Sequence, residues 1–359
     1  MALATATIDF SALRANLARV KELAPNSQVM AVLKANAYGH GLVPIAQQLA
    51  GADAFAVARI EEALALRTGG ITKPIVLLEG FFKASDIDIM LANNFQTIVH
   101  DEYQLAALEQ AQLSGQIKVW LKVDTGMHRL GVEPQQFEQF YQRLKGCANV
   151  HEQLHLMTHF ACADELENSY NQTQLATFTT LVSDKPAPLC LANSAAIINY
   201  PQSHGHWVRP GLMLYGVSPV QGKTSSELGL QPVMSLTSEV IAVRRVKKGE
   251  PVGYGGHWQA SADTQLAVVA IGYGDGYPRH AENGTPVLIN GRRYPLVGRV
   301  SMDMISVDIG ADNQSVAVGD DAIMWGAELG IEEIASCAST IAYELLCNIT
   351  PRVTYQYLN

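Results

Sequence analysis

The sequence has few cysteines, no excess of basic residues and no long apolar run, and each absence excludes a class of protein. Its five cysteines are odd in number, and none falls in a C-x-x-C pair. This pattern predicts free thiols in a reducing compartment rather than a disulfide framework. The net charge of −9 is opposite in sign to the basic face that nucleic-acid binding requires. We therefore expect no nucleic-acid partner.

Membrane and secretion signals are also missing. No stretch of 18 or more apolar residues predicts a membrane span, and the first residues lack the basic start and apolar core of a secretion signal. The 359 residues, 48% of them hydrophobic, are enough for two domains with large cores. We expect a cytoplasmic globular protein without membrane association.

Short apolar runs alternate with helical patterns over the first two thirds of the chain. The runs that we predict to be strands are 28–33, 54–59, 74–79, 95–99, 117–123, 153–159, 188–192 and one within 206–216. Apolar residues at helical spacing occupy 10–24, 61–67, 101–113, 134–145 and 172–182. Alternation of strand and helix predicts a parallel sheet, and eight such units are typical of a closed (β/α)8 barrel.

After about residue 230 the pattern changes to strands joined by short turns. Asn290-Gly291 between two apolar runs predicts a hairpin, and only 331–347 has helical spacing. The fold class that we predict is therefore α/β, with a TIM-like (β/α)8 barrel over 1–230 followed by a mainly antiparallel β domain over 231–359.

One motif points to a different chemistry. His151, Glu152 and His155 match the H-E-x-x-H pattern of zinc hydrolases, which requires both histidines on one helical turn. Here the segment leads into the apolar run 153–159, which we interpret as a strand. Four residues of strand separate the two Cα atoms by about 13 Å, too far for two zinc bonds. We expect no zinc, and a zinc hydrolase remains an alternative function.

Lys34 is the first candidate for chemistry. It directly follows an apolar strand in AVLKANAYGHG (31–41), and the carboxyl ends of barrel strands carry the active sites of barrel enzymes. A solvated lysine at a strand end is the simpler interpretation of this residue alone. The two glycines and the tyrosine that follow favour a phosphate site, beside which a partly desolvated lysine can form a Schiff base.

AVLKANAYGHG resembles the pyridoxal-phosphate (PLP) attachment signature of the alanine racemase family. Other stretches resemble the same family in the same order: KVDTGMHRLG (122–131), THFACADE (158–165), NSAA (193–196), VRPGLMLYG (208–216), GYGG (253–256), IGYGDGYPR (271–279) and GRVSMDM (298–304). A single short motif is weak, whereas eight in register over nearly the whole chain are specific. A barrel followed by a β domain is also the fold of this family.

The resemblance implies a role for each matching residue. Lys34 would carry PLP and act as one catalytic base, and Tyr254 would act as the second base from the partner subunit of a homodimer. His159 would hydrogen-bond that tyrosine, and Arg209 would face the pyridine nitrogen of PLP. Arg129 would lie near the carboxylate of the amino-acid substrate.

The resemblance also implies a phosphate site and a substrate entrance. The phosphate site would be formed by Tyr38, Ser194, Gly211 and Leu212. Met302 and Asp303 would reach the substrate across the dimer interface, while Tyr273 and Arg279 would line the entrance. Lys122 matches a lysine that some members carry carbamylated.

Two bases suit racemisation, since a proton must leave one face of the α-carbon and return on the other. An arginine is effectively always charged, so Arg209 cannot pass a proton to the pyridine nitrogen. Many PLP enzymes place an acid there and use the ring as a strong electron sink. A weaker sink would suppress transamination and favour simple reprotonation.

One departure from the family pattern lies near the C-terminus. Many members have a tyrosine before an Arg-Val pair, where it helps to hold the phosphate, but here the position is Pro351. Proline has neither a hydroxyl nor an amide donor. We therefore expect the anchoring of the phosphate and the width of the entrance to differ from those of such members. Tyr355 and Tyr357 are nearby candidates to replace the missing hydroxyl.

We therefore expect a PLP-dependent alanine racemase. A racemase of broader specificity, a non-catalytic PLP-binding protein and the zinc hydrolase are the alternatives. The presence of residues 231–359 and of Tyr254 favours the enzyme over a binding module. Supply of D-alanine for peptidoglycan and breakdown of D-alanine are both compatible with this expectation.

Overall fold

The computed structural model describes residues 4–359, whose contacts divide into two compact units. The barrel unit comprises 14–214 and 219–223. The β unit comprises the described residues up to 13 together with 215–218 and 224–359. Among the described residues, no helix is both long and apolar enough to cross a membrane.

Eight parallel strands of the barrel unit close into a barrel, as the sequence predicts. They are β2 (Gln28–Val32), β3 (Ala54–Val57), β4 (Ile75–Leu77), β5 (Phe95–Val99), β6 (Val119–Lys122), β7 (His155–Met157), β8 (Leu189–Asn193) and β9 (Trp207–Arg209). The eighth strand thus occupies the first part of 206–216, and it pairs back to β2. Most strand residues are buried because side chains fill the barrel inside and helices cover it outside.

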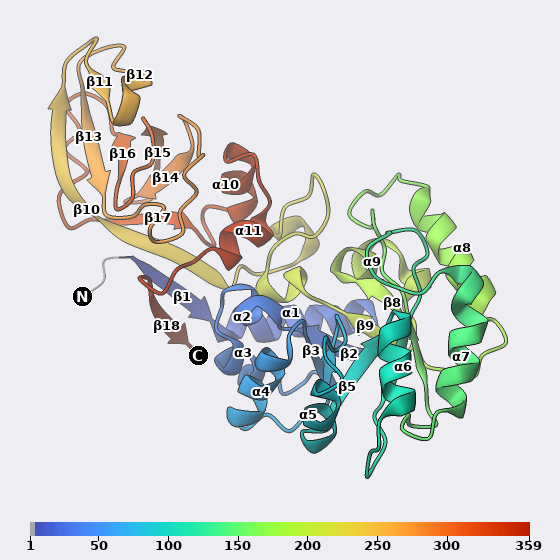
Figure 1. The fold of residues 1–359 in the computed structure, drawn as a ribbon. Helices are drawn as coiled ribbons and strands as arrows, with labels where there is room; N and C mark the ends of the chain where they lie inside the picture. The colour runs from blue at the N-terminus through green and yellow to red at the C-terminus, as the bar shows by residue number, and fades with distance from the viewer. Residues whose placement is uncertain (1–3) are drawn as a thin grey trace. The chain divides into compact units, whose positions relative to one another are not determined.

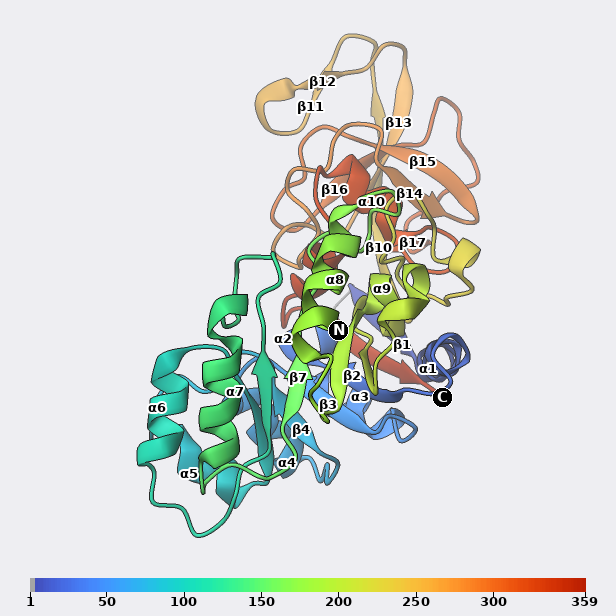
Figure 2. The same cartoon turned by 90° about the vertical axis from the view of Figure 1, so that its right-hand side faces the viewer.

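Helices follow the strands in sequence and lie outside them (Figure 1). They are α1 (Phe10–Leu23), α2 (Lys34–Tyr38), α3 (Leu42–Gln48), α4 (Ile60–Thr68), α5 (Asp86–Ala92), α6 (Glu102–Gln110), α7 (Phe137–Gly146), α8 (Tyr170–Val182) and α9 (Ser194–Asn199), with 3-10 turns η1 (Pro134–Gln136), η2 (Pro201–Ser203) and η3 (Leu212–Tyr215). Figure 2 shows α6 and α7 side by side. In α7, Phe137, Phe140, Tyr141 and Leu144 are buried, the spacing of one helix face.

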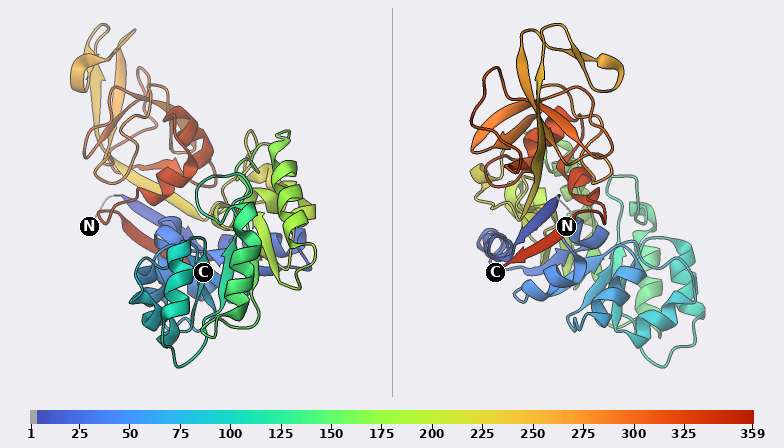
Figure 3. Two further views of the ribbon diagram at one scale, coloured as in Figure 1. Left: turned by 45° about the vertical axis from the view of Figure 1, so that its right-hand side comes forward. Right: turned by 90° about the vertical axis from the view of Figure 1, so that its left-hand side faces the viewer.

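The β unit is built on a mainly antiparallel sheet, also as predicted. Its strands are β1 (Thr5–Asp9), β10 (Met234–Val246), β13 (Thr264–Val269), β14 (Pro286–Ile289), β15 (Arg292–Val297), β16 (Ile305–Asp308), β17 (Asp321–Trp325) and β18 (Thr354–Leu358). They follow the order β13-β16-β15-β14-β17-β10-β1-β18, and a further pairing of β13 with β10 closes six of them into a ring. Short strands β11 (Pro251–Val252) and β12 (Trp258–Gln259) form a separate hairpin at one end of this unit (Figure 3).

The predicted hairpin is confirmed, and the segment 331–347, predicted to be helical, is helical with one interruption. Asn290 and Gly291 have φ of 50° and 73° between β14 and β15, as a tight turn of type I′ requires. The helical segment is two helices, α10 (Ile331–Cys337) and α11 (Ala342–Cys347). Ser339 is left-handed at φ 50°, and the Thr340 amide returns to the Ala335 carbonyl at 3.0 Å. This C-terminal cap ends α10.

The first strand belongs to the β unit rather than to the barrel unit. In β1, Ala6 and Ile8 are fully buried and alternate with partly exposed residues. The strand pairs antiparallel with β10 and parallel with β18. The contacts therefore group β1 with strands far along the chain. The division into two separate domains after residue 230 stays a prediction. Remaining 3-10 turns are η4 (Ser226–Leu228) and η5 (Tyr254–Gly256).

Candidate active site

The barrel collects the candidate residues of its unit at one end. Lys34 follows β2, Lys122 ends β6, His159 follows β7, Ser194 follows β8 and Arg209 ends β9. All of these strands are parallel, so their carboxyl ends form the face where barrel enzymes carry their active sites.

A left-handed turn follows Lys34. Ala35, Asn36, Ala37 and Tyr38 have φ between 51° and 54°, although none is glycine. Each such residue costs about 1–2 kcal/mol because its Cβ approaches the next carbonyl oxygen. Strain of this kind persists only where the surroundings hold it, and it is concentrated at functional sites.

The candidate phosphate residues come together beside this turn. A Cβ on Gly211 would lie 2.6 Å from the hydroxyl oxygen of Tyr38, so only glycine fits there. The Gly211 amide donates to Oγ of Ser194 at 2.8 Å. Tyr38, Ser194 and Leu212 are buried. A hydroxyl from each of two elements therefore meets the backbone amides at the end of β9.

Arg209 is buried and bound by neutral groups. Its Nη1 donates to the carbonyl oxygen of Cys190 at 3.0 Å and to the sulfur at 3.1 Å. Its Nη2 donates to the carbonyls of Thr158 at 2.9 Å and Leu191 at 3.2 Å, and to Nδ1 of His159 at 3.2 Å. Among residues 4–359, no carboxylate pairs with the guanidinium of Arg209, and its Nε has no hydrogen-bond partner. That donor is available to an acceptor on a ligand.

His159 is kept neutral by its surroundings. Burial, and then the neighbouring Arg209, hold the pKa of His159 well below its usual value. A guanidinium only donates, so Nδ1 of His159 accepts from Arg209 and the ring proton is assigned to Nε2. The histidine therefore presents an N–H donor on its far side.

Four cations surround this histidine. Arg209, Lys122, Arg129 and Lys34 all act electrostatically on His159. Burial lowers the pKa of Lys122 to about 7, with further contributions from Arg209, Arg129 and Lys34. Such a concentration of positive charge favours an anionic ligand, and it makes an uncharged lysine available near neutral pH.

The other candidate residues lie in the β unit. Tyr254 opens η5 and is 68% exposed. The amide of Gly274, next to Tyr273, donates to the carbonyl of Met302 at 2.8 Å. Tyr273 and Met302 are therefore on neighbouring loops, and Asp303 follows on the second of them.

Two further features of the β unit bear on the entrance and the phosphate. Arg279 lines an open cavity of about 410 Å³ together with His257, His280 and Arg299. Pro351 is exposed in the turn before β18. Tyr355 and Tyr357 lie in that strand with ring centroids 6.3 Å apart. No role in holding phosphate follows from this placement.

Sequence reasoning missed three residues that hold the candidates in place. Arg352 bridges Asp303 at 2.9 Å and the buried Asp275 at 3.2 Å. Cys190 binds Arg209, and Glu62 binds the turn after Lys34. Glu62 is the third residue of α4, but Arg59 rather than Ser or Thr precedes the helix, so the sequence carries only half of a capping signal. Neither of the others carries a local signal.

The H-E-x-x-H segment is not helical. His155 begins β7, and its ring lies 4.2 Å from that of Trp120. His151 precedes the strand, and its Nδ1 accepts from the amide of Gln153 at 3.1 Å. The strand interpretation is confirmed for His155 only, since residues 151–154 precede the strand as a bend; the helical arrangement that zinc hydrolases require is absent from this segment.

Comparison with known proteins assigns the chain to a family. The N-terminal domain model of alanine racemases matches residues 8–219, and the C-terminal domain model matches 233–357. The chain belongs to the alanine racemase family. It is 57% identical over 348 residues to an alanine racemase of Shewanella sp. (strain ANA-3), covering 97% of each chain. It is 56% identical over 357 residues to that of Vibrio parahaemolyticus, covering 99% of each.

A solved structure agrees with these relatives. The biosynthetic alanine racemase of Pseudomonas aeruginosa is 43% identical, with a TM-score of 0.97 and 100% of both chains covered. The matches confirm three expectations from the sequence: the alanine racemase family, the barrel followed by a β domain, and an enzyme of the amino-acid racemase class.

Proposed function

We propose that this member of the alanine racemase family interconverts L- and D-alanine, with PLP on Lys34 and with Tyr254 of the partner subunit as second base. Full-length relatives named alanine racemase support the substrate. The alanine racemase of Bartonella henselae, 30% identical with a TM-score of 0.90 over both full chains, contains covalently bound pyridoxal phosphate. That observation supports the cofactor.

The residues at the barrel end fit PLP. The Tyr38 hydroxyl approaches Gly211 so closely that a Cβ there would lie 2.6 Å away. The hydroxyls of Tyr38 and Ser194, together with the amides of Gly211 and Leu212, form a donor set suited to a phosphate. Nε of Arg209, which has no partner among residues 4–359, suits the pyridine nitrogen, which is an acceptor when unprotonated. Lys34 supplies the amine for covalent attachment.

PLP, when bound, withdraws electrons from the α-carbon and so acidifies its hydrogen. Nζ of Lys34 moves a proton to or from one face of that carbon. The phenolic oxygen of Tyr254 of the partner subunit does so on the other face. The Nε2–H of neutral His159 holds that oxygen by a hydrogen bond and stabilises its ionised form.

Two arginines orient the reactants. Arg129 is exposed, and its charge acts electrostatically on Lys122 and His159. It binds the carboxylate of alanine. Arg209 donates from Nε and keeps its proton, because a guanidinium does not lose its proton in proteins. Electron withdrawal by the ring therefore stays moderate, which favours return of the proton to the α-carbon over transamination.

The assembly that we propose is a homodimer with shared active sites in the cytoplasm. Tyr254, Met302 and Met304 are large apolar residues with exposed fractions of 68%, 51% and 41%. Such exposure in the β unit favours an interface with a second copy. Supply of D-alanine as a peptidoglycan precursor is the proposed role.

Borohydride reduction followed by peptide mapping tests the cofactor site. The phosphopyridoxyl group is expected on Lys34, and Lys34→Ala should abolish both labelling and interconversion of L- and D-alanine. Lys83→Ala, which removes an exposed lysine of another barrel loop, serves as the control. A label on a different lysine, or no racemisation by the unreduced protein, would refute the proposal. Racemisation assays with serine and other small amino acids measure how specific the enzyme is for alanine.

A further inference from the structure

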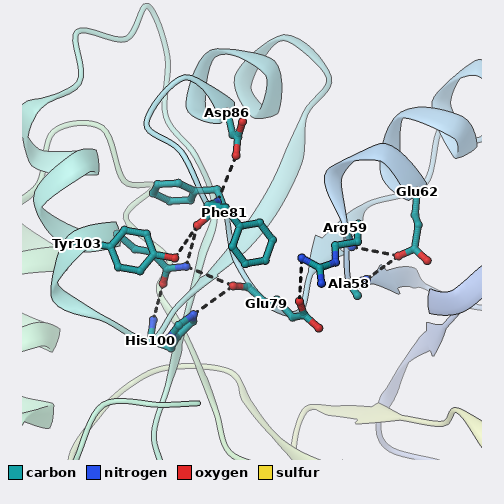
Figure 4. A network of polar contacts seen from close by, with 10 residues as sticks. Ala58, Arg59, Glu62, Glu79, Phe81, Asp86, His100 and Tyr103 are labelled. Carbon is teal, nitrogen blue, oxygen red and sulfur yellow. Dashed lines mark hydrogen bonds and ion pairs between the residues drawn. The ribbon is translucent and has the colours of Figure 1, made fainter. Parts of the chain in front are cut away.

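The left-handed turn after Lys34 is tied to the next barrel strand by one carboxylate. Oε1 of Glu62 accepts from the amide of Ala35 at 2.6 Å. Oε2 accepts from the amides of Ala58 at 2.9 Å and Arg59 at 3.1 Å, which precede α4 (Figure 4). Three backbone amides from two loops thus converge on a single side chain.

This bridge continues the pairing of β2 with β3 beyond the strands themselves. The two strands pair in register from Met30 with Ala54 to Val32 with Ala56, and the Leu33 amide still reaches the Ala56 carbonyl at 2.8 Å. After Lys34 the chain turns left-handed and the ladder ends. Glu62 then replaces the missing acceptor for the next amide.

The turn is also held by its own backbone. The Ala37 amide reaches the Leu33 carbonyl at 2.8 Å, the Gly39 amide reaches the Ala35 carbonyl at 3.0 Å, and Oδ1 of Asn36 accepts from the Leu42 amide at 2.9 Å. Glu62 is the side chain that binds the amide directly after Lys34. It also sits at the amino end of α4, where the helix dipole favours a negative charge.

The loop that leads into α4, and so to Glu62, is itself braced. Arg59 approaches Glu79 at 3.7 Å, and the Glu79 carbonyl accepts from Nε2 of His100 at 3.2 Å (Figure 4). These residues follow β3, β4 and β5. The position of Glu62 therefore depends on the rim of three successive strands.

We infer that Glu62 is a positioning residue, which fixes the direction of Lys34 by holding the strained turn behind it. The inference rests on the proposed role of Lys34. Glu62 touches neither substrate nor cofactor and acts through the amide of Ala35. Loss of one oxygen acceptor leaves the turn free to relax towards a right-handed conformation and moves Nζ of Lys34 from the reacting carbon.

Glu62→Gln tests this, because a glutamine side chain keeps one oxygen acceptor and replaces the other by an NH2 group. That NH2 group would face a backbone amide, which also donates, so no hydrogen bond forms there. The holoenzyme variant is expected to show a kcat about 100-fold lower, as displacement of about 1 Å produces, with KM changed less than about twofold. Hydrogen exchange of the segment 33–42, measured by mass spectrometry, should accelerate about tenfold or more. That readout does not depend on catalysis.

Asp86→Asn is the matched control. Oδ2 of Asp86 also accepts from two amides, those of Phe82 at 3.2 Å and Lys83 at 3.1 Å, beside α5. Asp86→Asn should lower the melting temperature by about as much as Glu62→Gln does. It should leave kcat and the hydrogen exchange of the segment 33–42 unchanged. A normal kcat in Glu62→Gln despite faster exchange would overturn the inference, as would an equal loss of kcat in Asp86→Asn.

Two further results keep the test decisive. Should Glu62→Gln not fold, Glu62→Asp keeps the charge but is too short to span both loops, and a normal kcat for it would overturn the inference. Should the unmodified protein racemise alanine with PLP on Lys34 while Glu62→Gln behaves like Asp86→Asn, only this inference fails. Absence of PLP from Lys34 in the unmodified protein refutes the proposed function instead.

Discussion

Arg209 is bound by two atoms of Cys190, its carbonyl oxygen at 3.0 Å and its sulfur at 3.1 Å. A buried permanent cation usually pairs with a carboxylate, because an unpaired charge is costly to bury. Here carbonyl dipoles and a thiol take that place, and the positive charge remains available to a ligand.

Replacement of Arg209 by Glu should change the type of reaction. A carboxyl group opposite the pyridine nitrogen would let that nitrogen hold a proton and strengthen electron withdrawal by the ring. We expect slower racemisation, a new long-wavelength absorbance with alanine, and more pyruvate from half-transamination. PLP content should stay close to that of the unmodified protein, although lost hydrogen bonds lower the melting temperature. Normal PLP content with neither new absorbance nor added pyruvate would contradict this.

Mixed dimers should reveal the shared active site. Lys34→Ala and Tyr254→Phe chains are each expected to be inactive, because each removes one of the two bases. After complete exchange of equal amounts, about half of the dimers are mixed and each of these has one intact pair, so activity should return towards about a quarter of that of the unmodified protein. Mass-labelled chains verify the exchange. Proven exchange without recovered activity would exclude a site shared between subunits.

Lys122 should form a carbamate with carbon dioxide. Its pKa of about 7 leaves much of the amine uncharged and nucleophilic near neutral pH, and a carbamate would add a negative charge among Arg209, Arg129 and Lys34. With ¹³C-bicarbonate, a carbamate signal should appear in the NMR spectrum and vanish in Lys122→Gln. Acid should also remove it. Retention of the signal in the variant would assign it to another amine.

His155 should make stability depend on pH. Burial lowers the pKa of His155 to about 4. Between about pH 6.5 and 4 the unfolded chain then binds more protons than the folded chain, so stability falls as pH falls. The full shift corresponds to about 3 kcal/mol in the free energy of unfolding.

His155→Phe removes this dependence, as denaturant unfolding at several pH values can measure. Near pH 7 the variant should be about as stable as the unmodified protein, because Nδ1 of His155 is buried without a partner. Racemase activity should persist. His280→Gln, at an exposed position, is the control. Identical pH dependence in the unmodified protein and His155→Phe would show that the histidine contributes nothing.

Local patterns were enough for most of the fold. Strands buried on both sides appear in the sequence as short apolar runs, and their alternation with helical spacing gave the eight-stranded barrel. Asn290-Gly291 predicted its turn because few residue pairs adopt positive φ at both positions. The break at Ser339 was missed, since serine is not a typical helix terminator and the apolar spacing continues through it.

The candidate site divides in the same way. The sequence by itself placed Lys34 at the carboxyl end of the first barrel strand, and motifs shared with a family added His159 and Arg209. The tertiary structure alone decided that Glu62 holds the turn after Lys34 and that Cys190 holds Arg209. It also decided that β1 pairs with strands more than 200 residues away. Spacing along the chain encodes burial and turns, whereas contacts between distant residues and pKa shifts from burial exist only once the chain has folded.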